Sequence, residues 1–85
     1  MEVAYTKKAK EDIAFWKNSG NKKILAKISD LIITISQTPF EGIGKPEPLK
    51  YNLTDYWSRR INNEHRLVYE VINNYILIHS LKGHY

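Results

Sequence analysis

The chain has 85 residues, a formal net charge of +4 and no cysteine. A chain of this length lies near the small end of what folds alone, so we expect residues 1–85 to form a single domain. The sequence lacks the roughly 18 consecutive apolar residues of a membrane span, and the missing cysteines exclude disulfides and thiolate metal sites. The first ten residues, MEVAYTKKAK, lack the apolar run of a signal peptide, which indicates a cytoplasmic location. The excess of Lys and Arg favours an anionic partner, either nucleic acid or an acidic protein.

The first element is predicted to be a short strand, MEVAYT, which a helix follows. Thr6 is a residue type that caps helices, and Ser19-Gly20 is a stop signal. Between them, apolar residues recur at positions i, i+4 and i+7, namely Ala9, Ile13 and Trp16. This spacing predicts an amphipathic helix.

A second helix is predicted from about Asn21 to Gln37. Its apolar stripe comprises Ile24, Ile28, Leu31 and Ile35, and Leu25 and Ile32 widen it. Thr38-Pro39 ends the helix because proline disfavours helical geometry in the residue before it. The two helices are therefore expected to form one layer.

Residues 39–53, PFEGIGKPEPLKYNL, carry all three prolines and two of the four glycines, which predicts a loop. Three segments rich in β-branched and aromatic residues follow, YWSRRIN, HRLVYEV and YILIHSL, and polar turns separate them. We expect an antiparallel meander that the N-terminal strand joins at one edge. The predicted fold class is α+β, with two N-terminal helices on one face of a small, mainly antiparallel sheet and the other face free for a partner.

The register of the first hairpin decides whether two arginines meet. Leu67, Tyr69 and Val71 suit the helix-covered face, so Arg66 points to the other face. If NNE is a three-residue loop centred on Asn63, Arg60 lies directly opposite Arg66. Like charges opposite each other are destabilising, and an anion between them would account for the pair. A two-residue loop would shift the pairing and remove this argument.

The register of the last hairpin stays open at this stage. A two-residue Asn73-Asn74 loop places His84 on the opposite parity from Arg66. A three-residue loop, or a bulge at Gly83, would bring both residues to one face.

Several polar residues are candidates for chemistry, although each of them alone is more often a solvated surface residue. Glu47 lies between Pro46 and Pro48, which restrict its backbone. His84 has a side chain whose unperturbed pKa of about 6.5 suits proton transfer. Lys50, Arg60 and Arg66 supply cations, and the ring of Tyr85 is able to stack on a base. Trp16 and Trp57 are interpreted as packing residues, and His65 and His79 as structural residues, because no zinc-ligand spacing is present.

Glutamate, histidine, arginine and lysine together suffice for metal-free RNA cleavage. A base removes the proton of a ribose 2'-hydroxyl, cations stabilise the pentacoordinate phosphorane, and an acid protonates the leaving 5'-oxygen. Such chemistry needs no cofactor, and the composition permits it without demonstrating it.

The segment TPFEGIGKPEPLKYNLTDYWSRRINNEHRLVYEV and the final GHY closely resemble the YoeB (Txe) toxins, a branch of the RelE-like ribosome-dependent mRNA interferases. The resemblance covers most of the chain and is specific, because GKPEPLK, WSRRI, EHRLVY and a terminal His-Tyr occur in order at nearly family length. It implies a toxin that cuts mRNA in the ribosomal A site and is held inactive by a cognate antitoxin of the YefM/Phd-like type. A homodimer is a further expectation of the family.

The same resemblance implies roles for individual residues. Glu47 of KPEP corresponds to the general base, Arg66 of EHRLVY to the residue that stabilises the phosphorane, and the penultimate His84 to the general acid. The last residue, Tyr85, is expected to orient the substrate. Lys50 of PLK and Arg60 of SRR are expected to hold phosphate.

Three functions are therefore compared. The first is a ribosome-dependent endoribonuclease. The second is a non-catalytic RNA- or ribosome-binding module, for which His84 is dispensable and salt weakens binding. The third is a protein of the toxin fold that serves only as a partner for another protein and does not arrest growth.

Overall fold

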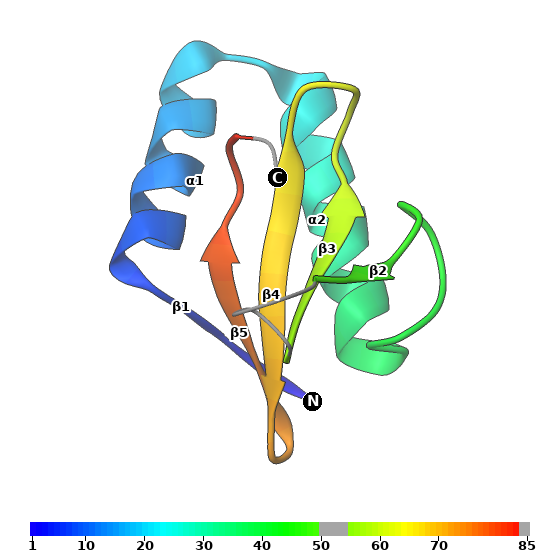
Figure 1. Cartoon of the computed structure of the whole chain (residues 1–85). Coiled ribbons are helices and arrows are strands. Elements are labelled where there is room, and N and C mark those ends of the chain that lie inside the picture. Colours follow the sequence, from blue (N-terminus) through cyan, green and yellow to red (C-terminus); the bar gives the residue numbers. More distant parts are fainter. Residues whose placement is uncertain (50–54, 84–85) are drawn as a thin grey trace.

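The computed structural model describes residues 1–49 and 55–83, so Lys50, His84 and Tyr85 lie outside the described residues. One five-stranded sheet has the strand order β1-β5-β4-β3-β2, and two helices pack on one of its faces (Figure 1). β1 pairs in parallel with β5, and the other neighbours are antiparallel. The α+β prediction is confirmed. In chain order the elements are β1 Glu2–Tyr5, α1 Lys7–Ser19, α2 Lys22–Gln37, β2 Glu47–Pro48, β3 Tyr56–Arg60, β4 Arg66–Ile72 and β5 Tyr75–Ser80.

The predicted cap at Thr6 is confirmed, and Asn21, the predicted start of the second helix, also acts as a cap. The Thr6 hydroxyl accepts a hydrogen bond from the Ala9 N–H at 3.1 Å, and the Asn21 side-chain oxygen accepts one from the Ile24 N–H at 3.1 Å. These bonds satisfy helix N–H groups that have no partner within the helix. Neither helix in the described part of the chain is long and apolar enough to cross a membrane.

The core lies between the helices and one face of the sheet. The predicted α2 stripe is buried, and Leu25 and Ile32 pack partly buried beside it. Burying one large apolar side chain fully stabilises the fold by about 1.5–3 kcal/mol, so this layer contributes most of the favourable free energy. The buried cluster consists of Ala9, Trp16, Ile24, Ile28, Leu31, Ile35, Ile61, Leu67, Tyr69, Ile76, Ile78 and Leu81.

The predicted loop over residues 39–53 is wrong in one respect, because it contains the edge strand β2. Glu47 is opposite Ser58 and Pro48 is opposite Trp57 in an antiparallel pair with β3. A proline cannot donate to a sheet ladder, but it is tolerated at a sheet edge. The two-residue strand has no alternating apolar pattern, so the tertiary pairing alone reveals it.

A buried arginine holds the chain between α2 and β2 in place. Arg59 on β3 is 0% exposed, and its side chain points toward the helices. Its Nη2 donates to the carbonyl oxygens of Thr38 at 2.7 Å and Glu41 at 2.9 Å, and its Nη1 donates to that of Ile43 at 3.2 Å. One side chain thereby fixes residues 38–44, which we call the arginine-bound loop.

Tyr69 on β4 completes this polar network inside the core. Its hydroxyl accepts a hydrogen bond from Arg59 Nε at 3.2 Å and donates one to the Pro39 carbonyl oxygen at 2.6 Å. Burial raises the pKa of the Tyr69 hydroxyl above its ordinary value, while the hydrogen bond and the charge of Arg59 act in the opposite direction. The network therefore keeps the phenol protonated as a donor to the loop.

The arginine-bound loop also approaches β3 through its backbone. The Gly44 carbonyl oxygen accepts a hydrogen bond from the Arg60 N–H at 2.7 Å. Gly44 has a φ of 84°, and a Cβ built there would lie 2.7 Å from Leu31 Cδ2 and 3.1 Å from Arg59 Cβ. Only glycine meets both the dihedral and the spatial requirement.

We predict that Gly44→Ala lowers the free energy of unfolding by about 2–4 kcal/mol, because the new methyl group adds overpacking to the cost of a positive φ. The matched control is Gly20→Ala, where φ is 71° but no atom lies within 4 Å of the added Cβ. The control is expected to lose only about 1–2 kcal/mol. Urea unfolding of both variants measures the difference, and equal losses would contradict the packing argument.

We predict that Arg59→Met lowers the free energy of unfolding by about 3–5 kcal/mol, because it leaves several carbonyl oxygens without their donor. Arg59→Lys is expected to recover little, since one ammonium group cannot reproduce the spread of the guanidinium donors. The control is Arg60→Met at the neighbouring, partly exposed position, for which we expect a change within about 0.5 kcal/mol. Thermal unfolding in which all three variants behave alike would refute the assigned role.

Candidate functional site

The sheet face turned away from the helices carries Glu47 and Arg66, the two candidate catalytic residues within the described part of the chain, and we call it the distal face. Trp57, Leu67 and Ile78 pack against the helix layer, so their strand neighbours point the other way. A row of paired residues crosses this face from β2 to β5, and it consists of Glu47, Ser58, Val68 and Ser80. Glu47 is exposed at the sheet edge, while Val68 is only 1% exposed. The distal face is therefore less open than the sequence predicts.

The arginine pair predicted from the NNE loop is present. Arg60 on β3 is the direct Cα partner of Arg66 on β4, as expected for a loop centred on Asn63. Both arginines share the distal face with Glu47, because residues 58 and 60, and residues 66 and 68, have the same parity. Arg66 Nη1 also donates to the Asn62 carbonyl oxygen at 3.1 Å. The fold thus brings Glu47, Arg60 and Arg66 to one face of the sheet.

The last hairpin has the two-residue Asn73-Asn74 turn of the first alternative, but it also contains a bulge at a position that was not predicted. Its turn has two residues, since Ile72 pairs with Tyr75, and a register shift occurs where Val68 pairs with Ser80 but Tyr69 pairs with Ile78. His79 is the extra residue, so the bulge lies before Gly83 rather than at it. The shift reverses parity along β5, because Ile78 faces the core and Ser80 faces the distal face. Lys50, His84 and Tyr85 lie outside the described residues, and their roles stay predictions.

The bulge places a histidine against two side chains of the distal face. His79 Nε2 lies 2.9 Å from Glu70 Oε1, and the His79 ring stacks on Tyr56 with 4.3 Å between centroids. Beside this cluster the Ser80 hydroxyl is buried and has no hydrogen-bond partner in the described part of the chain. No group of three or more potential ligands among the described residues is arranged to hold a metal ion.

The segment that precedes His84 is fixed by α1. The Leu81 N–H donates to Asp12 Oδ2 at 2.9 Å, and the Leu81 carbonyl oxygen accepts from Trp16 Nε1 at 2.9 Å. Lys8 lies 2.6 Å from the same carboxylate oxygen. Lys82 Nζ sits 4.0 Å from the centre of the Phe15 ring, a cation–π contact. Trp16 has the predicted packing role and also binds the backbone.

Sequence reasoning missed Asp12 and Arg59 as structural residues. Asp12 follows Ala9 by three positions and precedes Trp16 by four, which places it on the buried stripe of α1. Along β3, Arg59 has the same parity as Trp57 and the opposite parity to Arg60, and this alternation assigns Arg59 to the helix-covered face. Strand and helix periodicity therefore contained both signals.

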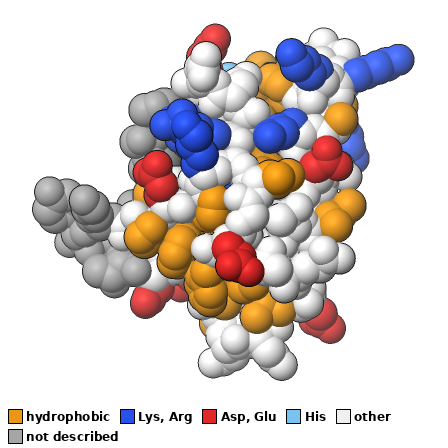
Figure 2. All heavy atoms as spheres, turned by 90° about the vertical axis from the view of Figure 1, so that its right-hand side faces the viewer, with side chains coloured by type: hydrophobic (Ala, Val, Ile, Leu, Met, Phe, Trp, Pro, Cys, Tyr) orange, Lys and Arg blue, Asp and Glu red, His pale blue; other side chains and the backbone are white. Residues whose placement is uncertain are grey.

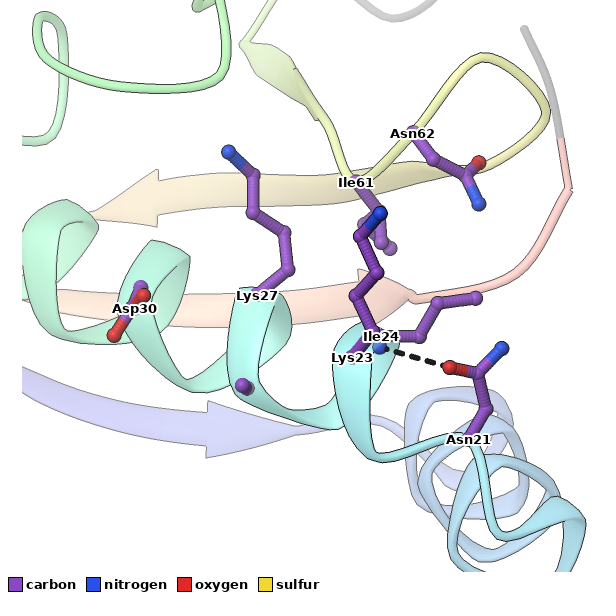
Figure 3. Close-up of a pocket in the computed structure, with 8 residues that line it drawn as sticks. Asn21, Lys23, Ile24, Lys27, Asp30, Ile61 and Asn62 are labelled. Atoms are coloured by element: carbon purple, nitrogen blue, oxygen red, sulfur yellow. Dashed lines mark hydrogen bonds between the residues drawn. The ribbon is translucent and has the colours of Figure 1, made fainter.

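A groove adjoins the arginine pair at the start of α2 (Figure 3). Its volume is about 490 Å³, and its two walls come from α2 and from the chain that follows β3. In the close-up, the Lys23 and Lys27 side chains extend from successive turns of α2 on the side of Ile61. Asn62 connects the groove to Arg66, whose guanidinium binds its carbonyl. The lining residues are Asn21, Lys23, Ile24, Ala26, Lys27, Asp30, Ile61 and Asn62.

The surface beside the groove is divided by chemistry. Figure 2 shows Lys and Arg side chains gathered at one end of this side of the molecule and hydrophobic side chains toward the other. Exposed apolar residues include Ile33 at 54%, Phe40 at 53% and Ile43 at 46%. Phe40 also contacts Trp57, with 5.0 Å between ring centroids. The positive end suits a phosphate backbone.

Comparisons with known proteins agree with this geometry. Residues 5–85 match the family described as YoeB-like toxin of bacterial type II toxin-antitoxin system. Toxin YoeB of Synechocystis sp. is 51% identical over 85 residues, which cover 100% of this chain and 98% of that protein. A YoeB dimer from Staphylococcus aureus superposes with a TM-score of 0.90 at 48% identity, covering 100% of this chain and 98% of the other. A YoeB-YefM complex from the same organism gives a TM-score of 0.88 at 49% identity, with the same coverage. The chain therefore belongs to the YoeB-like toxins of bacterial type II toxin-antitoxin systems.

Proposed function

We propose that this toxin is a ribosome-dependent endoribonuclease that cleaves mRNA in the ribosomal A site and so inhibits translation. The observation that carries the proposal is the strand register that places Arg60 opposite Arg66 on the face that also bears Glu47. Directly opposite residues with like charge are unfavourable, and a phosphodiester bound beside the two arginines would offset their charges. An RNA backbone supplies such an anion.

The proposed reaction is an attack within the RNA strand. Glu47 removes the proton of a ribose 2'-hydroxyl, and the 2'-oxygen forms a bond to the adjacent phosphorus. Arg66 stabilises the charge of the pentacoordinate phosphorane, while Lys50 and Arg60 hold phosphate. His84 protonates the 5'-oxygen as its bond to phosphorus breaks, and Tyr85 orients the substrate. The products are a 2',3'-cyclic phosphate and a 5'-hydroxyl end, and the route uses no metal.

The proposed partners follow from the family and from the surface. The YoeB of Staphylococcus aureus occurs both as a dimer and in complex with YefM, so a YefM/Phd-like antitoxin and a second copy of this chain are proposed here. The proposed substrate complex is mRNA on the ribosome, which places the toxin in the cytoplasm.

A second candidate function is a non-catalytic RNA- or ribosome-binding module. The groove favours it, because Lys23 and Lys27 extend the positive surface beyond the arginine pair. Binding of this kind would need the lysines but neither Glu47 nor His84. The two candidates therefore differ in which substitutions affect cleavage and which affect binding.

We predict that the wild-type toxin cuts mRNA only in the presence of ribosomes. Glu47→Gln and His84→Ala should each lower the cleavage rate by about 100-fold or more, because general acid and base groups contribute at least that factor. Primer extension in a purified translation mixture measures the cuts. Ribosome binding by each variant, measured by cosedimentation, is the control and should stay within about twofold. Intact binding without any cleavage by the wild type would favour the binding module instead.

We predict that the double substitution Lys23→Glu, Lys27→Glu weakens ribosome binding about tenfold or more and lowers its salt dependence, because fewer counterions are released from RNA. The matched control is Lys7→Glu, Lys10→Glu on exposed positions of α1, which makes the same change in net charge. Titrations at several salt concentrations compare the two. Equal weakening by both pairs would show that net charge alone matters and that the groove is not a contact surface.

A further inference from the structure

Both backbone polar groups of Gly83 are bound by two consecutive residues where β4 begins, His65 and Arg66. The Gly83 N–H donates to His65 Nδ1 at 3.0 Å, and the Gly83 carbonyl oxygen accepts from the Arg66 N–H at 2.9 Å. Gly83 is the last described residue, and it directly precedes the proposed general acid, His84. The two bonds therefore tie the residue before His84 to the strand that carries Arg66.

The His65 ring is itself held by α1. It contacts the edge of Trp16 with 4.8 Å between ring centroids, and its side chain is only 18% exposed. Trp16 also donates to the Leu81 carbonyl oxygen. One tryptophan therefore positions both the ring and the strand end that the ring binds.

The bond to Gly83 sets a chemical requirement on His65. A ring nitrogen accepts a hydrogen bond only when it carries no hydrogen, so the hydrogen of the neutral ring lies on Nε2. Within the described part of the chain, the acidic group paired with this nitrogen is Glu64, with Oε2 at 3.9 Å and a side chain that is 85% exposed. At that distance and exposure it interacts weakly with the ring, so the site depends on Nδ1 as an acceptor.

The hydrogen bond to His65 matters for the chain direction because the residue that it holds, Gly83, is a glycine. Its φ is 108°, and an added Cβ would meet no atom within 4 Å. Glycine populates both signs of φ with similar ease, so its conformation is fixed by surrounding contacts and not by a side chain of its own. Without the bond to His65, the direction of the chain after Gly83 would be set by the carbonyl bond alone.

We propose that His65 is a positioning residue for the cleavage reaction, which it serves by holding the Gly83 N–H and thereby the backbone from which His84 extends. The inference rests on the proposed function, and it adds a residue that touches neither substrate nor reacting atoms. A misplacement of about 1 Å in a catalytic group lowers rates by about 100-fold, so the effect of losing this bond should be measurable.

The test uses three substitutions that separate the acceptor from the ring. The side-chain oxygen of His65→Asn lies close to the former Nδ1 position, whereas that of His65→Gln lies close to the former Nε2 position. His65→Phe keeps a ring against Trp16 and removes both nitrogens. We expect Phe and Gln to lower the single-turnover cleavage rate on saturating programmed ribosomes by about 10- to 100-fold, and Asn to restore most of it. The toxin concentration that half-saturates the ribosome should stay within about twofold for all three.

A second readout does not depend on activity. In the free toxin, NMR hydrogen exchange of the Gly83 amide should be slowed in the wild type and in His65→Asn, and fast in His65→Gln and His65→Phe. Equal exchange in all four proteins, or equal cleavage rates despite different exchange, would overturn the positioning role. A wild type that never cleaves would refute the proposed function, while the exchange comparison would still test the contact. If His65→Phe fails to fold, the Asn and Gln pair decides the outcome.

Discussion

The site-bearing half of the sheet depends on the hydrogen bonds that the buried guanidinium group of Arg59 donates. This group lies inside the core, yet its hydrogen bonds go to backbone carbonyls of residues 38–44 and to Tyr69, and within the described part of the chain no carboxylate forms an ion pair with it. A buried cation without such bonds would be strongly destabilising, so the loop and the arginine must be ordered together. Residues 38–44 lead directly to β2, and their order therefore sets where Glu47 meets β3.

A second network orders the other end of the chain by a different kind of contact. Asp12 and Trp16 bind the backbone of Leu81, and His65 binds that of Gly83. Backbone groups in such a segment need partners wherever water is excluded, and side chains of α1 provide them. The first helix thus has a role beyond core packing, because it supports the residues that lead to the proposed acid.

The two networks meet on neighbouring strands. Arg59 and Arg60 are adjacent on β3, so one faces the core and binds the loop while the other faces Arg66 on the distal face. His65 and Arg66 are adjacent where β4 begins, and they bind the N–H and the carbonyl oxygen of Gly83, respectively. Successive side chains of a strand point to opposite faces, so one residue can stabilise the fold while its neighbour takes part in the proposed chemistry. The groove at Lys23 extends the positive surface from there along α2.

The sequence by itself determined the two helices, the cap at Thr6 and the meander, because each follows from periodicity, capping or short turns over neighbouring residues. It left open the register that pairs Arg60 with Arg66, and the tertiary structure decided for the three-residue loop. The GKPEPLK, WSRRI and EHRLVY motifs also identified the family. Only the tertiary structure decided the strand β2, the bulge at His79 and the backbone contacts of His65. These features depend on partners far apart in the chain, and β2 is too short and proline-rich to carry a strand pattern of its own. Local patterns specify local geometry, whereas pairing across the sheet is settled by packing of the whole core.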